Sequence, residues 1–185
     1  AEFVAYAKAN PGKINYGSSG NATITHLYCE MVNLGAGIKM THVPYRGVAE
    51  AYLDLLAGRV QLMIDSQPTA LPQIKSGKVK AIAVTSGQRA PQFPNLEAVA
   101  ETYPGFEAIA FLSFTVRKEV PVEIQRKLGK WVMEVLYLPN VNKRLLEIGI
   151  TPPPKDWDIA KSDAFVKRER ELWTKYIKLA KIEPQ

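Results

Sequence analysis

The stretch with the most chemical content is residues 16–26, Tyr-Gly-Ser-Ser-Gly-Asn-Ala-Thr-Ile-Thr-His. Its pattern predicts a strand that ends in a small, glycine-flanked turn, after which a helix begins at once. Such a turn directs free backbone N–H groups and the positive end of the helix dipole at one point. The hydroxyls of Ser18, Ser19 and Thr23 lie beside that point, so the turn fits a carboxylate or a phosphate. Helix capping by Ser19 or Asn21, which needs no ligand, is an alternative.

A serine hydrolase is a less favoured alternative for the same turn. The nucleophile-elbow pattern is nearly matched by residues 17–21, with Asn21 where the last glycine belongs. His26 and Asp65 would complete a triad on paper. However, His26 lies on the helix that follows the turn, and the usual chain order places the histidine after the acid. A phosphate-binding P-loop is excluded, because no lysine follows the glycine at the required spacing.

Two further strand ends carry polar groups. The run His-Val-Pro-Tyr-Arg-Gly at residues 42–47 joins a predicted strand to a helix and places Tyr45 and the Gly47 N–H at the edge where Ser19 lies. Asp65 follows the next strand, where it serves equally well as a cap for the helix that comes after it. Open α/β sheets bind ligands at the carboxyl ends of their strands, so this edge is the candidate site.

Three other residues with reactive side chains are better explained as structural. His42 is expected to be a hydrogen-bonded residue at a strand end, and His26 a hydrogen-bonded helix residue. Cys29 lies among apolar residues of the same helix and is expected in the core. One cysteine and two histidines are too few for the usual zinc sites, so we expect no metal and no cofactor.

The elements that would position these groups alternate along the first part of the chain. Strands are predicted at residues 13–17, 38–43, 60–64, 79–84 and 108–116. Helices are predicted at residues 21–34, 48–56 and 69–74, the first of them ended by Gly35. This alternation predicts an α/β fold with a largely parallel sheet covered on both faces.

After residue 116 the pattern becomes helical. Helices are predicted at residues 121–137, 141–148 and from Asp156 to about Ala180, with a rigid proline-rich connection at 151–154. The chain therefore divides into a lead-in helix at 1–13, an α/β domain at 14–116 and a helical segment at 117–185.

Composition places the chain among soluble globular proteins. It has 185 residues, of which 46% are hydrophobic and 23% charged. No apolar run approaches the roughly 20 residues that a membrane-spanning helix needs. Most of the net charge of +6 lies after residue 116, on helices of mixed sign, and basic clusters with interleaved aromatic residues are missing. A nucleic-acid partner is therefore not expected.

Several of these motifs together resemble the Bug-type extracytoplasmic solute receptors of tripartite tricarboxylate transporters. The resemblance rests on residues 16–27, on 42–47, and on the run Met-Ile-Asp-Ser-Gln-Pro-Thr-Ala-Leu-Pro-Gln-Ile-Lys-Ser-Gly-Lys-Val-Lys-Ala-Ile-Ala-Val-Thr that follows. It continues through Gln88-Arg89-Ala90-Pro91 and Pro104-Gly105-Phe106-Glu107 into the terminal helices, and so spans essentially the whole chain.

The resemblance implies a two-lobed, periplasmic-binding-protein-like fold, a small carboxylate ligand, no catalytic residues, a periplasmic location and membrane transporter subunits as partners. The α/β domain at 14–116 would be the second lobe. By resemblance, its anion cradle is formed by Ser18, Ser19, Gly20, Asn21, Ala22 and Thr23. Tyr45, Gly47 and Asp65 would line the cleft nearby.

The resemblance also implies a segment before residue 1 that supplies most of a first lobe, on which residues 117–185 would pack. Without it, we expect weak carboxylate affinity, and a homodimer formed through the C-terminal helices that carry Trp131 and Trp173. A sensor or binding module that uses the same lobe outside transport is the alternative to a transport receptor.

Overall fold

The computed structural model describes residues 2–180 and 182. The chain divides into two compact units. Unit 1 comprises Ala1–Ala110 with Lys175–Gln185, and unit 2 comprises Phe111–Thr174. Each unit is described below by itself.

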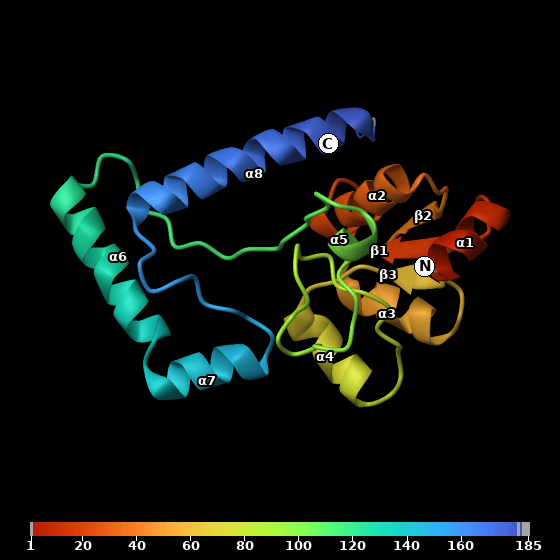
Figure 1. Ribbon diagram of the computed structural model, residues 1–185, viewed down its shortest axis with the longest axis horizontal. Coiled ribbons are helices and arrows are strands. Elements are labelled where there is room, and N and C mark those ends of the chain that lie inside the picture. The colour runs from red at the N-terminus through yellow and green to blue at the C-terminus, as the bar shows by residue number, and fades with distance from the viewer. Residues whose placement is uncertain (1, 181, 183–185) are drawn as a thin grey trace. The chain divides into compact units, whose positions relative to one another are not determined.

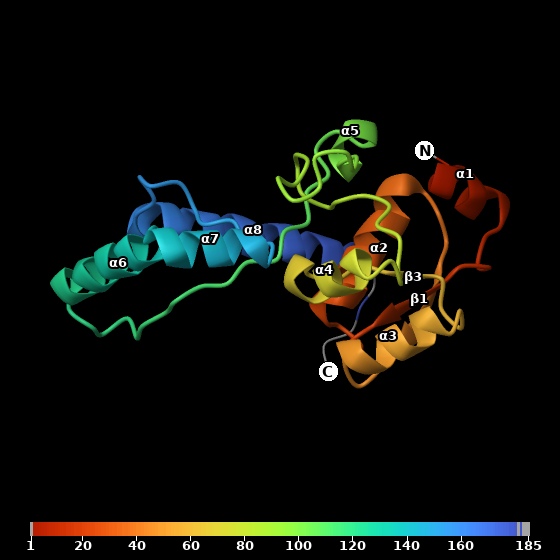
Figure 2. The same ribbon diagram turned by 90° about the horizontal axis from the view of Figure 1, so that it is seen from below.

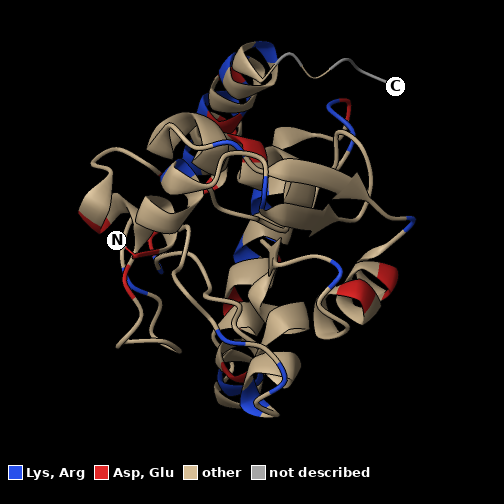
Figure 3. Ribbon diagram, turned by 90° about the vertical axis from the view of Figure 1, so that its right-hand side faces the viewer, with Lys and Arg blue, Asp and Glu red and all other residues tan. Residues whose placement is uncertain are grey.

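Unit 1 is built on a three-stranded parallel sheet. Its strands are β1 (Asn15–Ser18), β2 (Thr41–Pro44) and β3 (Leu62–Met63), in the order β2-β1-β3. In the register of the sheet, Tyr16 of β1 lies between His42 of β2 and Leu62 of β3. The three strands carry no charged residue, as Figure 3 shows, because both faces of the sheet are covered by helices. The predicted parallel sheet is confirmed.

The strand order places helices on opposite faces of this sheet. The chain leaves β1 through α2 (Ile24–Ala36) for β2 on one side, and returns through α3 (Val48–Leu56) to β3 on the other side of β1. Right-handed crossovers in opposite directions put their helices on opposite faces. Figures 1 and 2 show α2 and α3 on the two sides of the strands.

Alternation along β1 supplies a different residue to each face. Tyr16 is fully buried in a core that includes Cys29 of α2 and Ala7 of α1 (Glu2–Ala9). Gly17 faces the other way, and a Cβ placed on it would lie 3.4 Å from Ala51 of α3. The expected core position of Cys29 is confirmed.

The bounds of α2 differ from the prediction at both ends. The helix begins at Ile24 rather than at residue 21, because Ala22 adopts a left-handed conformation with φ of 56°. It ends after Ala36, at Gly37 with φ of 60°, and the N–H of Ile38 donates to the carbonyl of Asn33. Gly35 thus lies inside the helix instead of ending it.

Two predicted strands are wrong. Within the described residues, the segment 79–84 forms only one isolated bridge, between Val84 and Ala98. In the segment 108–116, the N–H of Ala108 donates a hydrogen bond to the carbonyl of Thr85. The rest of this segment has no strand partner among the described residues, and Leu112 and Phe114 are 81–85% exposed. Apolar β-branched and aromatic residues favour a strand only where a neighbouring strand is present to pair with them.

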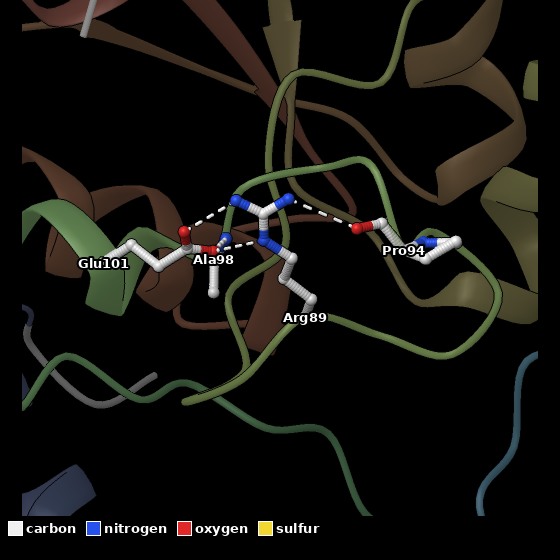
Figure 4. Close-up of polar contacts among 4 residues, drawn as sticks. All are labelled: Arg89, Pro94, Ala98 and Glu101. Atoms are coloured by element: carbon white, nitrogen blue, oxygen red, sulfur yellow. Dashed lines mark hydrogen bonds and ion pairs between the residues drawn. The ribbon is translucent and has the colours of Figure 1, made fainter.

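A loop after the bridge is held by one arginine. The guanidinium of Arg89 donates two hydrogen bonds of 2.7 Å to the Glu101 carboxylate and a third, of 3.2 Å, to the Pro94 carbonyl. Glu101 also accepts the N–H of Ala98, as Figure 4 shows. Glu101 lies on the short helix α5 (Val99–Thr102), so the arginine ties the loop to that helix. The remaining helix of unit 1 before α5 is α4 (Gln67–Lys75), which contains Pro72.

Unit 2 is helical. It contains α6 (Val122–Leu136), α7 (Pro139–Glu147) and most of α8 (Ile159–Leu179), which confirms the three predicted C-terminal helices. Asp158 caps α8 by accepting the N–H of Lys161 at 2.8 Å. Charges of both signs run along α8 (Figure 3). Among the described residues, no helix is long and apolar enough to cross a membrane.

Candidate functional site

The candidate site is the loop of residues 18–23, called here the 18–23 loop, which joins β1 to α2. Ser18 is fully buried at its start, and its Oγ lies 3.2 Å from the N and 3.1 Å from the O of Gly20. At its end, the Thr23 hydroxyl donates to the same Gly20 carbonyl at 2.7 Å. Both hydroxyls are therefore engaged in closing the turn.

Free donors remain at the start of α2. The first intrahelical bond runs from Leu27 to the Thr23 carbonyl, and Thr23 makes no capping bond with its side chain. In the part of the chain that the structure describes, the N–H groups of Ile24, Thr25 and His26 have no acceptor. Three unpaired N–H groups at a helix N-terminus attract an anion.

Ser19 presents a hydroxyl beside these amides. Its N–H donates to the Thr25 Oγ1 at 2.9 Å, and its own Oγ lies 3.0 Å from the same atom. Asn21 and Ala22 are exposed at the tip of the loop. Among the polar side chains of the loop, that of Asn21 is exposed and those of Ser19 and Thr23 are partly exposed.

The second predicted strand end lies beside the first. The N–H of Tyr45 donates to the Ser18 carbonyl at 3.1 Å, and Gly47 precedes the first turn of α3. The Tyr45 hydroxyl, however, donates to Asp54 at 2.7 Å. Burial and the Asp54 carboxylate raise the pKa of Tyr45 to about 12. Tyr45 is thus at the expected edge, with its hydroxyl already bonded within the protein.

Asp65 is held by its own surroundings. It accepts the hydroxyl of Tyr52 at 3.2 Å and the N–H of Ser66 at 2.7 Å, and burial raises its pKa. Ser66, rather than Asp65, occupies the position before α4. Within the described residues, no hydrogen bond joins Asp65 to the 18–23 loop.

The two histidines lie together beneath the loop. The Nδ1 of His26 accepts the N–H of Ala22 at 3.1 Å, and the Nε2 of His42 lies 2.6 Å from the Ser18 Oγ. Both were expected to be hydrogen-bonded structural residues, and both are. Nothing in the sequence predicted that their rings stack, with centroids 3.7 Å apart, because they belong to different elements.

The hydrolase triad does not form. Ser19, the serine at the elbow position, contacts Thr25 rather than a histidine. His26 accepts a backbone N–H, and Asp65 is bonded by Tyr52 and Ser66. The three side chains of the proposed triad thus have other partners in the structure.

A wide, open hollow lies in unit 2 against α7. Its lining residues are Tyr137, Pro139, Asn142, Lys143, Leu146 and Glu147. None of these side chains is buried, so the hollow lacks the convergent buried polar groups of a ligand site. The 18–23 loop remains the candidate.

One family model matches nearly the whole chain, and curated relatives match most of it. The family model described as "Tripartite tricarboxylate transporter family receptor" (TctC) matches residues 1–180. A protein of Pseudomonas sp. strain P51, from the tcbD-tcbE intergenic region, is 35% identical over 173 residues, which are 92% of this chain and 51% of that protein. BugT of Bordetella pertussis is 29% identical over 92% of this chain and 52% of its own length. The chain therefore spans about half the length of these curated relatives.

Solved structures agree in fold. Rpa4515 of R. palustris, solved with adipate, superposes with a TM-score of 0.86 at 31% identity, over 100% of this chain and 61% of that one. The periplasmic binding protein BugD has a TM-score of 0.77 at 33% identity, over 100% and 62%. MatC of Rhodopseudomonas palustris, solved with malate, has a TM-score of 0.75 at 25% identity, over 95% and 60%. The predicted periplasmic-binding-protein-like α/β lobe is confirmed.

The matched family is one of transporter receptors, and BugD is a periplasmic binding protein rather than an enzyme. The expectation of no catalytic activity is thereby confirmed, and the hydrolase alternative is rejected.

Proposed function

Because this chain belongs to the TctC family of tripartite tricarboxylate transporter receptors, we propose that it binds a small carboxylate at the 18–23 loop for transport. The observation that supports this proposal most is the set of unpaired N–H groups on Ile24, Thr25 and His26, beside the Ser19 hydroxyl. A carboxylate oxygen accepts such donors, and the helix dipole favours its charge.

The fold and the solved relatives support the same ligand class. The loop lies at the carboxyl end of the central strand of a parallel sheet, where open α/β sheets bind ligands. Rpa4515 and MatC were solved with the dicarboxylates adipate and malate. We extend this class, small dicarboxylates, to the present chain.

Location and partners form the remaining part of the proposal. Family membership supports a periplasmic receptor that delivers its ligand to the membrane subunits of a tripartite transporter. A homodimer through the C-terminal helices remains a prediction, which the sedimentation experiment described in the Discussion tests.

A binding experiment tests the ligand class directly. We would record amide NMR spectra of the 185-residue chain during titration with adipate and then with malate. We expect concentration-dependent shifts of the Ile24, Thr25 and His26 amides, and no shifts with the uncharged diamide of adipate. If neither dicarboxylate shifts these amides, or if the diamide shifts them equally, the proposal is wrong.

A variant with a negative charge at the tip of the 18–23 loop tests the position of the binding site. Asn21→Asp adds a negative charge to an exposed side chain of the 18–23 loop without changing its size. Repulsion between charges about 4 Å apart in water is about 1 kcal/mol, so adipate affinity should fall roughly fivefold. Asn95→Asp makes the same change on an exposed residue of another loop and should leave the affinity unchanged.

A further inference from the structure

Three rings from three elements stack beneath the 18–23 loop. His26 of α2 and His42 of β2 are nearly parallel, with an interplanar angle of 8° and centroids 3.7 Å apart. Tyr16 of β1 lies near both imidazoles, with its centroid 5.0 Å from that of His42 and 6.2 Å from that of His26. His26 is 8% exposed, Tyr16 is fully buried and His42 is partly buried, so the three rings lie at the border of the interior of unit 1.

Each histidine of the stack holds a different part of the loop. His26 Nδ1 accepts the N–H of Ala22, near the end of the loop. His42 Nε2 is bonded to the Oγ of Ser18, at its beginning, and that oxygen is in turn bonded to Gly20. The loop is thus attached through both halves to one pair of packed rings.

These bonds hold Ala22 in an unfavourable backbone conformation. Ala22 is the one residue other than glycine with a positive φ among those the structure describes. Its Cβ makes the left-handed region costly, so such a residue needs surrounding contacts to keep it there. The N–H of Ala22 donates to the Nδ1 of His26, and this bond fulfils that role.

We propose that His26 and His42 are positioning residues of the anion site, whose stacked, uncharged imidazoles hold the 18–23 loop in the shape that exposes the N–H groups of α2. The proposal rests on the function proposed above. It concerns residues that touch the loop rather than the ligand.

The requirement for an uncharged ring follows from donor and acceptor geometry at His26. Its Nδ1 accepts an N–H, so a proton on that atom would place two donors against each other. A charge on either ring would also face the other ring at 3.7 Å. The Ser18–His42 bond has no such requirement, since a hydroxyl can donate or accept.

The surroundings favour uncharged rings. Burial lowers the pKa of His26, and burial together with His26 lowers the pKa of His42 to about 4. The nearby groups that titrate are Tyr16, Cys29 and Glu30. Burial raises the pKa of both Tyr16 and Cys29, so they stay uncharged. The Glu30 carboxylate, which accepts the Tyr16 hydroxyl, opposes burial at His26 without reversing the direction.

The lowered pKa values of the two histidines determine how the stability of the 18–23 loop depends on pH. The ordinary histidine pKa is 6.5, and both rings bind a proton less readily in the closed loop. Acid therefore favours states in which the rings are released. The closed loop should keep its full stability above about pH 6.5 and lose it progressively as the pH falls toward about 4.

The test uses the 185-residue chain without ligand, so that it does not depend on binding. Amide hydrogen exchange at Ala22 and Gly20, corrected for intrinsic rates, would be measured by NMR from pH 7.5 to 4 together with the imidazole nitrogen shifts. We expect protection at neutral pH that declines below pH 6.5 as the His26 signal titrates. A protection factor that does not change with pH would overturn the proposal.

Two substitutions at one position separate hydrogen bonding from packing. His26→Asn places an acceptor near the position of Nδ1 but binds no proton, so Ala22 should stay protected and lose its pH dependence. His26→Phe keeps a ring for the stack but offers no acceptor, so Ala22 should exchange at least about tenfold faster at every pH. Equal exchange in the two variants would overturn the proposal.

Folding and ligand binding are controlled separately. Exchange at Tyr52 of α3, on the opposite face of the sheet, should be the same in both variants. If either variant does not fold, the pH profile of amide exchange in the natural chain decides whether the proposal holds.

Adipate titration at pH 7 then distinguishes the positioning role of the histidines from the proposed function. A protected, pH-sensitive loop that binds no dicarboxylate contradicts only the proposed function. Binding that is unchanged in His26→Phe, or that tightens in acid, contradicts only the positioning role.

Discussion

Adjacent residues of β1 face opposite sides of the sheet. One side accommodates a large side chain, and the other leaves no room for one. Tyr16 points into the core with α2, where its hydroxyl donates to Glu30 at 2.6 Å. Gly17 points toward α3, and a Cβ there would lie 3.3 Å from the Met63 Cγ and 3.4 Å from Ala51. The absence of a side chain at position 17 lets α3 approach the strand that leads into the 18–23 loop.

We therefore expect Gly17→Ala to lower the free energy of unfolding by about 1 kcal/mol, because the added methyl group must displace Met63. Urea unfolding followed by circular dichroism would measure it. Truncation at Met63 creates room for the methyl group, so the same substitution should cost less in a Met63→Ala background. An equal cost in both backgrounds would show that steric contact with Met63 is not the cause.

At the scale of elements, the segment 84–108 depends on side chains rather than on a strand ladder. It has one backbone bridge, and Arg89 ties it to α5. The guanidinium of Arg89 and the N–H of Ala98 hold the pKa of the Glu101 carboxyl at about 2. The folded pKa lies below the ordinary value, so this contact is complete above about pH 4.5 and is lost as the pH falls toward 2.

Arg89→Lys should raise the Glu101 pKa toward its ordinary value, because lysine cannot donate two parallel hydrogen bonds to one carboxylate. The remaining bond from Ala98 should keep that pKa below 4.5. Carboxyl carbon shifts in an NMR titration would measure it. Arg117→Lys, in an exposed pair with Glu119, serves as the control that leaves Glu101 unchanged. An unaltered Glu101 pKa in Arg89→Lys would contradict the assignment.

At the scale of the whole molecule, unit 2 leaves much of its apolar surface exposed. On α6, Ile124, Trp131 and Val135 are each about half exposed and recur on one helix face. Exposed apolar faces of this kind tend to associate. This surface is the physical basis for the predicted homodimer.

Sedimentation velocity over a range of concentrations tests that prediction. We expect the chain to sediment faster as its concentration rises, and the double variant Trp131→Glu, Val135→Glu to remain a monomer. Leu53→Glu, which changes a leucine of α3 that is 65% exposed, is the matched control and should associate like the natural chain. A compact monomer at every concentration would contradict the homodimer.

Features that depend on near neighbours in the chain could be predicted from the sequence. Glycine-flanked turns and helical spacing were sufficient to predict the parallel sheet, the 18–23 loop and the three C-terminal helices, because these signals lie within a few residues of one another. The helix at Val48–Leu56 was predicted with its correct bounds.

Contacts between residues that are distant in the chain could not be predicted in this way. The strands expected at 79–84 and 108–116 do not form, since pairing requires a neighbouring strand that the local sequence cannot specify. Tyr45 is directed to Asp54 by the fold. His26 and His42 come together because β2 pairs with β1 in a register that places His42 beside Tyr16, under the start of α2. Contacts of this kind arise from strand register and helix packing, which join residues that are far apart in the chain.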